Sequence, residues 1–267
     1  MLNRGGYIFV GCLIFFCVSS CDSYQKILKS TDLDLKYEKA VEYYEKDDFY
    51  KALPLFEELI SVQRGSKNVE KIYYYYCYCH YGLNDFLLAS FHFKNFTRTY
   101  SNSEYAEECQ FMNAYCQYLM SPDKNLDQSF TSKAMLAFQL FINMYPQSER
   151  VAECNDYIDQ LRHKIQAKDY AGAKLYYELG YFKAAYTALA GLLVEYPDIP
   201  NKEEIRYYIL RSHFRYAMNS VKEKKQERFD AAIKAYNTLV MKHPNGEFKK
   251  AADNIYETIS KNLIKLN

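Results

Sequence analysis

The amino-acid sequence predicts an all-α protein, an α-solenoid of about five helix pairs that ends in a capping helix. Two observations support this fold class. The chain contains only 9 Gly and 6 Pro among 267 residues, too few turn residues for a β fold with many hairpins. A small residue followed by large residues four and seven positions later recurs five times along the chain. A helix pair with this pattern cannot bury both of its faces alone, so it needs copies of itself on either side.

Composition argues against a nucleic-acid-binding protein and indicates a chain rich in tyrosine. The formal net charge is +1, so the chain has no excess of basic residues with which to bind nucleic acid. The chain contains 29 Tyr and 17 Phe but no Trp, and a tyrosine ring can pack at one end while its hydroxyl meets water. We therefore expect amphipathic aromatic faces and no nucleic-acid partner.

Residues 1–20 are expected to be a lipoprotein signal peptide and not part of the fold. Their apolar run, over residues 7–18, is shorter than the roughly 20 residues that span a bilayer. The run ends in Val-Ser-Ser-Cys at residues 18–21, which resembles the lipobox of bacterial lipoproteins. That resemblance implies cleavage before Cys21, a lipid such as palmitate on Cys21, and a short tether over residues 21–33. Asp22 follows the cysteine directly. In some enteric bacteria an aspartate at this position keeps lipoproteins in the inner membrane, so the sequence leaves the final membrane open.

Each repeat is expected to hold two helices joined by a short turn. The first two pairs are predicted over residues 34–63 and 69–100. The second pair turns at Gly82, because glycine tolerates the backbone angles that end a helix. The third pair starts with Ser103 as the N-cap of its first helix, and an insertion follows Pro122 before its second helix.

The later pairs are longer than the first two. The fourth opens with a long helical run over residues 148–178, interrupted at most near residues 169–172, and turns at Gly180. The fifth carries a charged insertion over residues 221–227. A final helix over residues 247–266 is apolar on one face and charged on the other, as the cap of a solenoid requires.

The repeated pattern resembles the tetratricopeptide repeat. Three of the five copies also end in an aromatic residue or histidine followed by proline. We divide the fold into repeats one to three, residues 34–146, and repeats four and five with the cap, residues 147–267. The small residue of each copy is, in chain order, Ala52, Ala89, Ala134, Ala185 and Ala232.

The first helices of the first three pairs carry aromatic stripes. Their members are spaced i, i+4 and i+7, so each set lies along one helix face. Adjacent stripes would make a groove for an extended, aromatic-containing peptide, although rings that simply pack against neighbouring helices would produce the same pattern. The three sets are Tyr37, Val41 and Tyr44; Tyr74, Tyr78 and Tyr81; and Phe111, Tyr115 and Tyr118.

The equivalent positions of the fourth and fifth pairs are more mixed in charge. We interpret this half as a docking surface for a protein and not as a peptide slot. The residues at these positions are Tyr170, Lys174 and Tyr177 in the fourth pair and Ile209, His213 and Tyr216 in the fifth.

No motif in the sequence indicates an enzyme, a cofactor or a metal. Cys77 and Cys79 are two residues apart on a helix, so they face different ways and cannot share a zinc ion. Packing explains these cysteines best, although Cys79 and Cys116 occupy equivalent positions of neighbouring repeats, so a disulfide between them stays open. The five histidines are scattered without ligand spacing, and the glycine-rich and nucleophile motifs of enzymes are absent from the sequence.

Four segments carry a resemblance to a known family: CDSYQKILKSTD, YEKAVEYYEKDDFYKALPLFEEL, YYYYCYCHYGLNDFLLASFHFKNF and FQLFINMYPQSERVAEC. With the lipobox and five repeats, the chain resembles the BamD family of outer-membrane assembly lipoproteins in its Bacteroidetes-like form. The resemblance implies a lipid-anchored scaffold on the periplasmic face of the outer membrane. It implies that the N-terminal repeats bind unfolded outer-membrane β-barrel proteins. It also implies that the C-terminal repeats dock the periplasmic POTRA domains of the barrel subunit BamA.

Two other readings of the sequence remain. A different periplasmic tetratricopeptide scaffold, such as a coordinator of envelope division, would share the repeats but usually adds a coiled coil. A SusD-like glycan-binding lipoprotein would share the helical repeats and the aromatic content. That family is about twice as long and stacks glycans on Trp and Tyr platforms, whereas this chain has no Trp.

Overall fold

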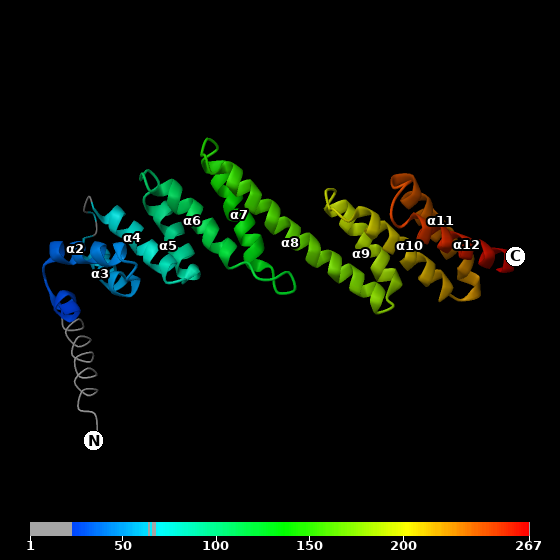
Figure 1. The fold of residues 1–267 in the computed structure, drawn as a ribbon, viewed down its shortest axis with the longest axis horizontal. Helices are drawn as coiled ribbons and strands as arrows, with labels where there is room; N and C mark the ends of the chain where they lie inside the picture. Colours follow the sequence, from blue (N-terminus) through cyan, green and yellow to red (C-terminus); the bar gives the residue numbers. More distant parts are fainter. Residues whose placement is uncertain (1–22, 64, 66–67, 267) are drawn as a thin grey trace, which may run out of the picture. The chain divides into compact units, whose positions relative to one another are not determined.

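The structure is a computed structural model that describes residues 23–63, 65 and 68–266. Within these residues every regular element is a helix and no strand is present, which confirms the all-α prediction (Figure 1). The predicted lipidation site, Cys21, lies outside the described residues. The helices are α2 (Leu33–Glu45), α3 (Phe49–Val62), α4 (Val69–Gly82), α5 (Phe86–Thr99), α6 (Ala106–Leu119), α7 (Ser129–Met144), α8 (Val151–Glu178), α9 (Phe182–Glu195), α10 (Lys202–Met218), α11 (Lys222–Lys242) and α12 (Lys249–Leu266).

The described chain divides into two compact units. Unit 1 contains the described residues up to Pro122 together with Gln128–Ile158, and therefore the pairs α2–α3, α4–α5 and α6–α7. Unit 2 contains Asp123–Asp127 and residues from Asp159 onward. The boundary falls inside α8 and not between repeats three and four at residue 146. The insertion after Pro122 belongs to unit 2 because its Leu126 carbonyl accepts a hydrogen bond from the Lys168 ammonium of α8.

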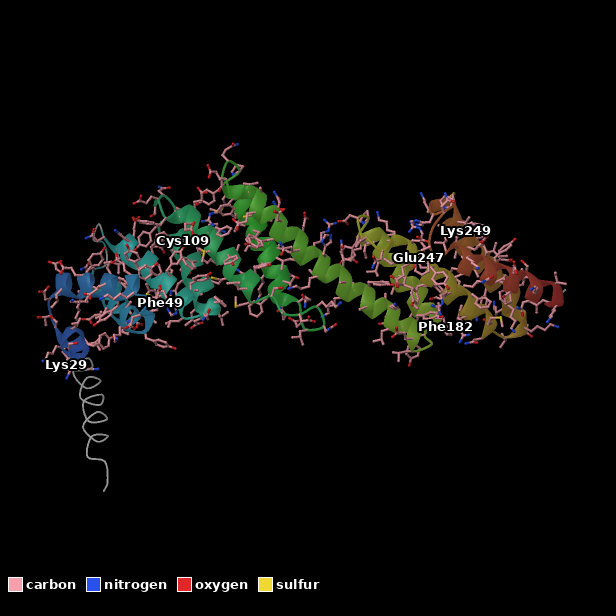
Figure 2. All side chains as sticks on the ribbon, in the orientation of Figure 1. Lys29, Phe49, Cys109, Phe182, Glu247 and Lys249 are labelled. Carbon is pink, nitrogen blue, oxygen red and sulfur yellow. The ribbon has the colours of Figure 1, made fainter. Side chains whose placement is uncertain are left out.

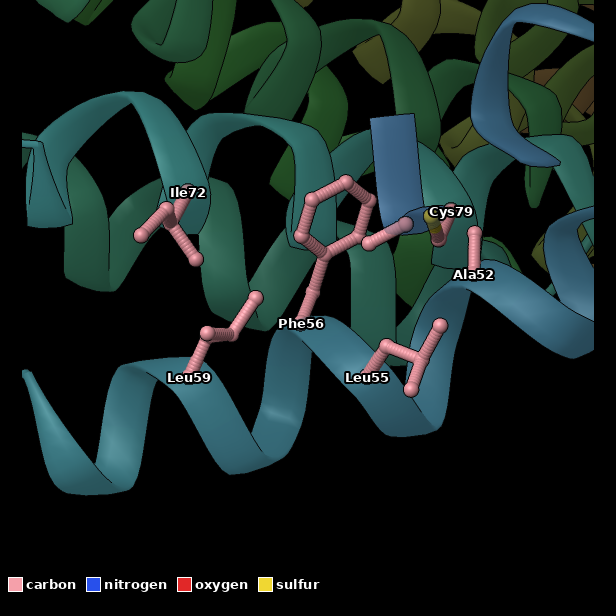
Figure 3. Close-up of a cluster of buried hydrophobic side chains, with 7 residues drawn as sticks. Ala52, Leu55, Phe56, Leu59, Ile72 and Cys79 are labelled. Carbon is pink, nitrogen blue, oxygen red and sulfur yellow. The ribbon is translucent and has the colours of Figure 1, made fainter. Parts of the chain in front are cut away.

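The five alanines of the repeated pattern have no exposed surface, so each helix pair is packed as the spacing predicts. Figure 3 shows the first of these contacts, where Ala52, Leu55, Phe56 and Leu59 of α3 form a buried cluster with α4. Alanine lets the two helices approach closely, and the larger residues fill the space beside it. Each fully buried Leu or Phe contributes roughly 1.5–3 kcal/mol of transfer free energy.

Gly82 ends α4 for a different reason from the one the sequence suggests. The residue with positive φ in that turn is Asn84, at 59°, and Gly82 keeps a helical conformation. The ring of Phe49, labelled in Figure 2, approaches Gly82 so closely that a Cβ atom there would overlap it. Glycine is therefore required by close packing, not by the turn. In the fourth pair the prediction for Gly180 holds, since its φ is 83°.

Residues 23–29 form a helix and not an extended polar tether. Tyr24, Ile27 and Leu28 pack against the core of the first pair. The Tyr24 hydroxyl donates to the carbonyl of Lys51 at 3.1 Å, and its ring meets that of Tyr43 edge-on at 5.7 Å. The apolar residues at i, i+3 and i+4 give this short segment a face that it can bury.

Three smaller differences separate the structure from the sequence prediction. The segment predicted as a charged insertion, residues 221–227, forms the N-cap and the first turns of α11, because it consists mainly of good helix formers and contains no Gly or Pro. α8 runs without interruption through residues 169–172. Tyr105 and not Ser103 is the N-cap of α6, while the Ser103 hydroxyl accepts a hydrogen bond from the Tyr105 amide in the turn before it.

Candidate functional site

The two aromatic faces of α4 have different surroundings. Tyr73, Tyr76 and His80 pack against His92 of α5, with ring centroids 4.9–6.0 Å apart. The opposite face carries Tyr74, Tyr78 and Tyr81, and each of these rings is half-buried. The first face is therefore part of the helix-pair core, and the second is the one that the sequence assigns to a groove.

Half-buried tyrosines form a continuous series of ring contacts from α4 to the start of α8, which we name the aromatic ladder. On α4, Tyr74 and Tyr78 lie 4.8 Å apart, and Tyr78 and Tyr81 lie 6.2 Å apart, between ring centroids. Tyr81 is 6.5 Å from Tyr115 of α6. The ladder consists of Tyr74, Tyr78, Tyr81, Tyr115, Tyr118 and Tyr157.

The last ladder residue, Tyr157, is one that sequence reasoning missed. It lies in the first part of α8, 4.6 Å from Tyr118 and 5.7 Å from Tyr115 between ring centroids. The sequence placed it in a long helical run without an aromatic stripe, so no local pattern marked it. Tyr105, whose ring centroid lies 4.6 Å from that of Tyr74, was also missed. It precedes α6, so it belongs to no helical stripe.

A carboxylate fixes the middle of the ladder. The Tyr78 hydroxyl donates to Glu108 Oε1 at 2.7 Å, and Arg150 Nη2 donates to Glu108 Oε2 at 2.6 Å. Burial, reinforced by the negative charge of Glu108, raises the pKa of Tyr78 well above its usual range. The hydroxyl therefore stays protonated at neutral pH and keeps donating its hydrogen bond.

The remaining predicted groove residues differ in exposure. Tyr37 and Tyr44 are half-buried on α2, and Tyr44 lies 4.7 Å from Tyr75 of α4 between ring centroids. Phe111 is only 3% exposed, and the guanidinium of Arg150 covers its ring at 4.1 Å. Phe111 therefore packs against the Tyr115 ring, with centroids 5.9 Å apart, and is too buried to contact a partner.

The predicted docking residues of unit 2 lie among cations that the sequence prediction did not include. Lys174 lies 4.7 Å from the Tyr208 ring centroid and 3.4 Å from Glu204 Oε1. The Arg211 guanidinium covers the Tyr177 ring at 4.7 Å. These cation–π contacts join residues of different helices, so the sequence alone could not indicate which cation covers which ring.

The other two docking residues also pack against side chains from neighbouring helices. His213 stacks on Tyr186 with a centroid distance of 3.9 Å, and burial lowers its pKa, so the imidazole is neutral at pH 7. Tyr216 lies under the Arg228 guanidinium at 4.0 Å. The result is an aromatic surface of unit 2 with basic groups above it.

The chain was compared with protein families and with curated proteins. The family model of YfiO, an outer membrane lipoprotein, matches residues 30–228. This match covers well over half of the chain. The chain belongs to the YfiO family.

Curated proteins similar to this YfiO family member carry one functional description. A putative outer membrane protein assembly factor BamD of Aquifex aeolicus is 25% identical over 221 residues, which is 82% of this chain and 71% of the relative. The outer membrane protein assembly factor BamD of Caulobacter vibrioides is 18% identical over 230 residues, 86% of this chain and 74% of the relative. The resemblance to BamD that the sequence indicated is therefore confirmed.

Three further features concern the described residues of this YfiO family member. No helix among them has both the length and the apolarity needed to cross a membrane. No group of three or more His, Cys, Asp or Glu among them could hold a metal ion. The described cysteines Cys77, Cys79, Cys109, Cys116 and Cys154 are buried and form no disulfide with one another.

Proposed function

We infer that the chain is a lipid-anchored, non-enzymatic assembly factor on the periplasmic face of the outer membrane, as the names of its relatives and its family suggest. In this proposal unit 1 binds unfolded outer-membrane β-barrel proteins. Unit 2 docks a BamA-type barrel subunit through its POTRA domains. The lipid on Cys21 holds the scaffold at the membrane.

The observation that carries the peptide-binding part is the aromatic ladder. Six tyrosines from three helices follow one another at ring distances of 4.6–6.5 Å, and all are half-buried. Such rings offer apolar faces to the aromatic side chains of an extended strand, and their hydroxyls can bond to its backbone. A strand of an unfolded β-barrel alternates apolar and polar residues, and the apolar ones would contact the ladder.

The aromatic surface of unit 2 supports a protein partner with exposed carboxylates. Arg211 and Arg228 lie over tyrosine rings. Arg228 Nη1 donates to Ser220 Oγ, and the other guanidinium donors could bind a carboxylate of a partner. Arginine and tyrosine are the residues most often found at the energetic centre of protein interfaces. Lys174, Tyr177, His213 and Tyr216 belong to the same proposed surface.

A pull-down from gently solubilised envelopes with the tagged, lipidated protein tests the assembly role. We expect recovery of a BamA-type barrel protein. Recovery of a TonB-dependent glycan transporter would favour a SusD-like role, and recovery of a division complex would favour an envelope coordinator. Either of these results without the barrel subunit would overturn the assembly proposal.

Peptide binding tests the ladder directly. The probe is a labelled peptide with the sequence of the last strand of an outer-membrane barrel, compared with a peptide in which its aromatic residues are replaced by Ser. We expect Tyr81→Ala and Tyr115→Ala to weaken binding of the aromatic peptide at least tenfold, while Tyr50→Ala, an 80% exposed tyrosine off the ladder, changes nothing. Equal affinity of all variants would contradict this part of the proposal.

A further inference from the structure

Unit 1 has a hollow that lies between α5 and α7 over α6. Its volume is about 670 Å³. We name it the amide-floored groove. The residues that form its floor are Ser90 of α5 and Gln110, Asn113 and Gln117 of α6. None of them belongs to the aromatic ladder, so the groove is a separate feature of the same unit.

One polar group on the floor has no partner. Asn113 Oδ1 accepts hydrogen bonds from Ser90 Oγ at 3.0 Å and from Gln117 Nε2 at 3.2 Å. Gln110 is 3% exposed, and its Nε2 donor makes no hydrogen bond to any described residue. A buried donor without an acceptor is unfavourable, so a ligand that supplied an acceptor at this point of the floor would be stabilised there.

Comparison with the preceding repeat explains why the groove is open. Adding 37 to the positions of Tyr73, Tyr76 and His80 of α4 gives Gln110, Asn113 and Gln117 of α6. In the second pair those rings and His92 of α5 occupy the space beside the helix. In the third pair, amides replace the rings on α6. On α7, the alignment of Ala89 with Ala134 places Ala137 where α5 has His92.

The first repeat shows which group contacts the side chain at the position equivalent to Gln110. The residue 37 positions before Tyr73 is Lys36, which is fully buried. Its ammonium donates to the carboxylate of Glu58, which lies on the neighbouring helix α3, at 2.6 Å. A carboxylate carried by a helix therefore satisfies this position in the same protein.

The rim of the groove combines exposed apolar side chains with basic ones. Five apolar residues are 48–72% exposed, namely Leu87, Phe91, Leu136, Leu140 and Met144. The charged lining residues are Lys94, Arg98 and Lys133, and none of the described residues that line the groove is a carboxylate. The surface thus complements an occupant that is apolar on one face and acidic at its edges.

We propose that the amide-floored groove binds an acidic amphipathic helix of a partner protein. The apolar face of that helix packs against Leu136, Leu140 and Phe91, and its flanking carboxylates meet Lys94, Arg98 and Lys133. One carboxylate inside the apolar stripe accepts the Gln110 Nε2 hydrogen bond. The lining residues of α7 extend from Phe130 to Met144, about 21 Å of helix, so roughly four turns of the partner fit beside them.

A lipid surface is the main competing occupant, because exposed apolar and basic residues also suit a bilayer interface. A bilayer, however, supplies a flat apolar layer and does not reach a recessed amide floor. The recess and the unpartnered Gln110 donor favour a protein helix, and the experiment distinguishes the two.

The probe is a fluorescein-labelled, helix-forming peptide of about 16 residues with a Leu face and Glu flanks, long enough for about four turns. A matched peptide replaces every Glu with Lys. Binding to the mature lipidated protein in nanodiscs is measured by fluorescence anisotropy. We expect the acidic peptide to bind at least tenfold more tightly than the basic one. We expect Gln110→Leu to weaken binding of the acidic peptide several-fold.

Charge and shape variants locate the binding. We expect Lys94→Glu with Lys133→Glu to weaken acidic-peptide binding at least tenfold, and Ala137→Phe, which fills the groove, to abolish it. The matched control is Lys222→Glu with Lys234→Glu, two exposed lysines of unit 2, and it should leave binding unchanged. Tyr81→Ala on the aromatic ladder should also leave it unchanged, which separates this site from the proposed peptide site.

Three results would overturn the proposal. The first is equal binding of the acidic and basic peptides. The second is unchanged binding in both groove variants. The third is absence of peptide binding together with quenching, by nitroxide-labelled lipids, of a fluorophore placed at Leu136→Cys, because that result would identify the groove as a membrane contact.

Discussion

The ammonium group of Lys36 lies 2.6 Å from both carboxylate oxygens of Glu58 and donates a hydrogen bond to the carbonyl of Leu28 at 3.0 Å. Lys36 is 1% exposed. One buried side chain therefore ties the helix of residues 23–29 to the first helix pair. If Cys21 carries the lipid, as proposed, the lipidated residue precedes the start of this helix by two positions in the sequence.

Removal of the carboxylate should cost more stability than removal of the lysine. Glu58→Gln leaves the Lys36 ammonium buried with a weaker partner, so we expect a loss of about 1–3 kcal/mol in the free energy of unfolding by urea. Lys36→Met keeps the packing and leaves Glu58, whose side chain is 41% exposed, in contact with water, so its loss should be smaller. Glu42→Gln, which weakens the exposed ion pairs of Glu42 with Lys39 and Lys46, should cost less than either of these changes. A larger loss for Lys36→Met than for Glu58→Gln would contradict this account.

Two glycine-to-alanine substitutions should have opposite signs. A Cβ at Gly82 would overlap the Phe49 ring, so Gly82→Ala should destabilise the protein by about 1–3 kcal/mol as the ring is displaced. Gly172 lies within α8 with open space around it, so Gly172→Ala should stabilise by about 0.5–1 kcal/mol through helix propensity. Thermal unfolding of both variants checks the prediction. Stabilisation by Gly82→Ala would show that the ring moves freely.

The repeat pattern predicted most of the fold because it records helix packing directly. A small residue where two helices touch, with large ones four and seven positions later, is a local signature of a helix pair, and all five alanines are buried as it requires. The turn at Gly180 was predictable because few residues tolerate a positive φ.

The features that sequence reasoning missed depend on contacts between distant segments. Tyr157 joins the aromatic ladder only because α8 packs beside α6, and Arg150 reaches Glu108 across 42 residues of sequence. The role of Gly82 depends on a ring of the preceding pair. The burial of Phe111 likewise follows from tertiary packing, because its i, i+4 and i+7 spacing is the same as that of the half-buried stripe on α4.

The stacked imidazoles of His80 and His92 should make the protein less stable in mild acid. Burial, with a further contribution from the charge of His80, lowers the pKa of His92 to about 4, and burial lowers that of His80 against the opposing charges of Asp85 and Glu57. Below the ordinary histidine pKa near 6.5, these two side chains bind protons more readily in the unfolded chain than in the folded protein. The free energy of unfolding therefore falls as the pH is lowered from about 6.5 to about 4.

Urea unfolding at pH 7 and pH 5 measures this effect. We expect His92→Gln to reduce the loss of unfolding free energy between the two pH values by about 1 kcal/mol, because the variant has one buried base fewer. His163→Gln, at an exposed histidine, is the control and should leave the loss unchanged. An identical pH dependence in the wild type and His92→Gln would exclude this explanation.

The buried cysteines should be unreactive in the folded protein. Burial raises the pKa of Cys79 and Cys116 to about 12 and that of Cys154 to about 11, so almost no thiolate exists at neutral pH. We expect a thiol reagent such as DTNB to modify these side chains only after unfolding in urea. Rapid labelling of the native protein, or a mobility change on non-reducing gels, would contradict the packing role and reopen a disulfide between Cys79 and Cys116.

Glu108 should couple the stability of unit 1 to the aromatic ladder, the proposed peptide-binding surface. Its carboxylate accepts hydrogen bonds from Tyr78 at 2.7 Å and Arg150 at 2.6 Å, and Arg150 in turn covers Phe111 beneath the ladder. Tyr78→Phe removes one charge-assisted bond and keeps the ring, so we expect a loss of about 1–2 kcal/mol. Glu108→Ala leaves two donors without their acceptor, so its loss should be larger, about 2–4 kcal/mol.

The double variant decides whether the two groups act as one unit. If the Tyr78 hydroxyl acts only through Glu108, the double variant Tyr78→Phe with Glu108→Ala should lose little more free energy of unfolding than Glu108→Ala alone. Urea unfolding can resolve this departure from additivity. Tyr50→Phe, at an exposed tyrosine, supplies the baseline for loss of a hydroxyl. Because the ladder rings remain in Tyr78→Phe, that variant should keep barrel-strand peptide binding within about threefold, whereas Glu108→Ala should weaken it by releasing Arg150 from Phe111. Additive stability losses, or unchanged peptide binding in Glu108→Ala, would show that Glu108 does not organise the ladder.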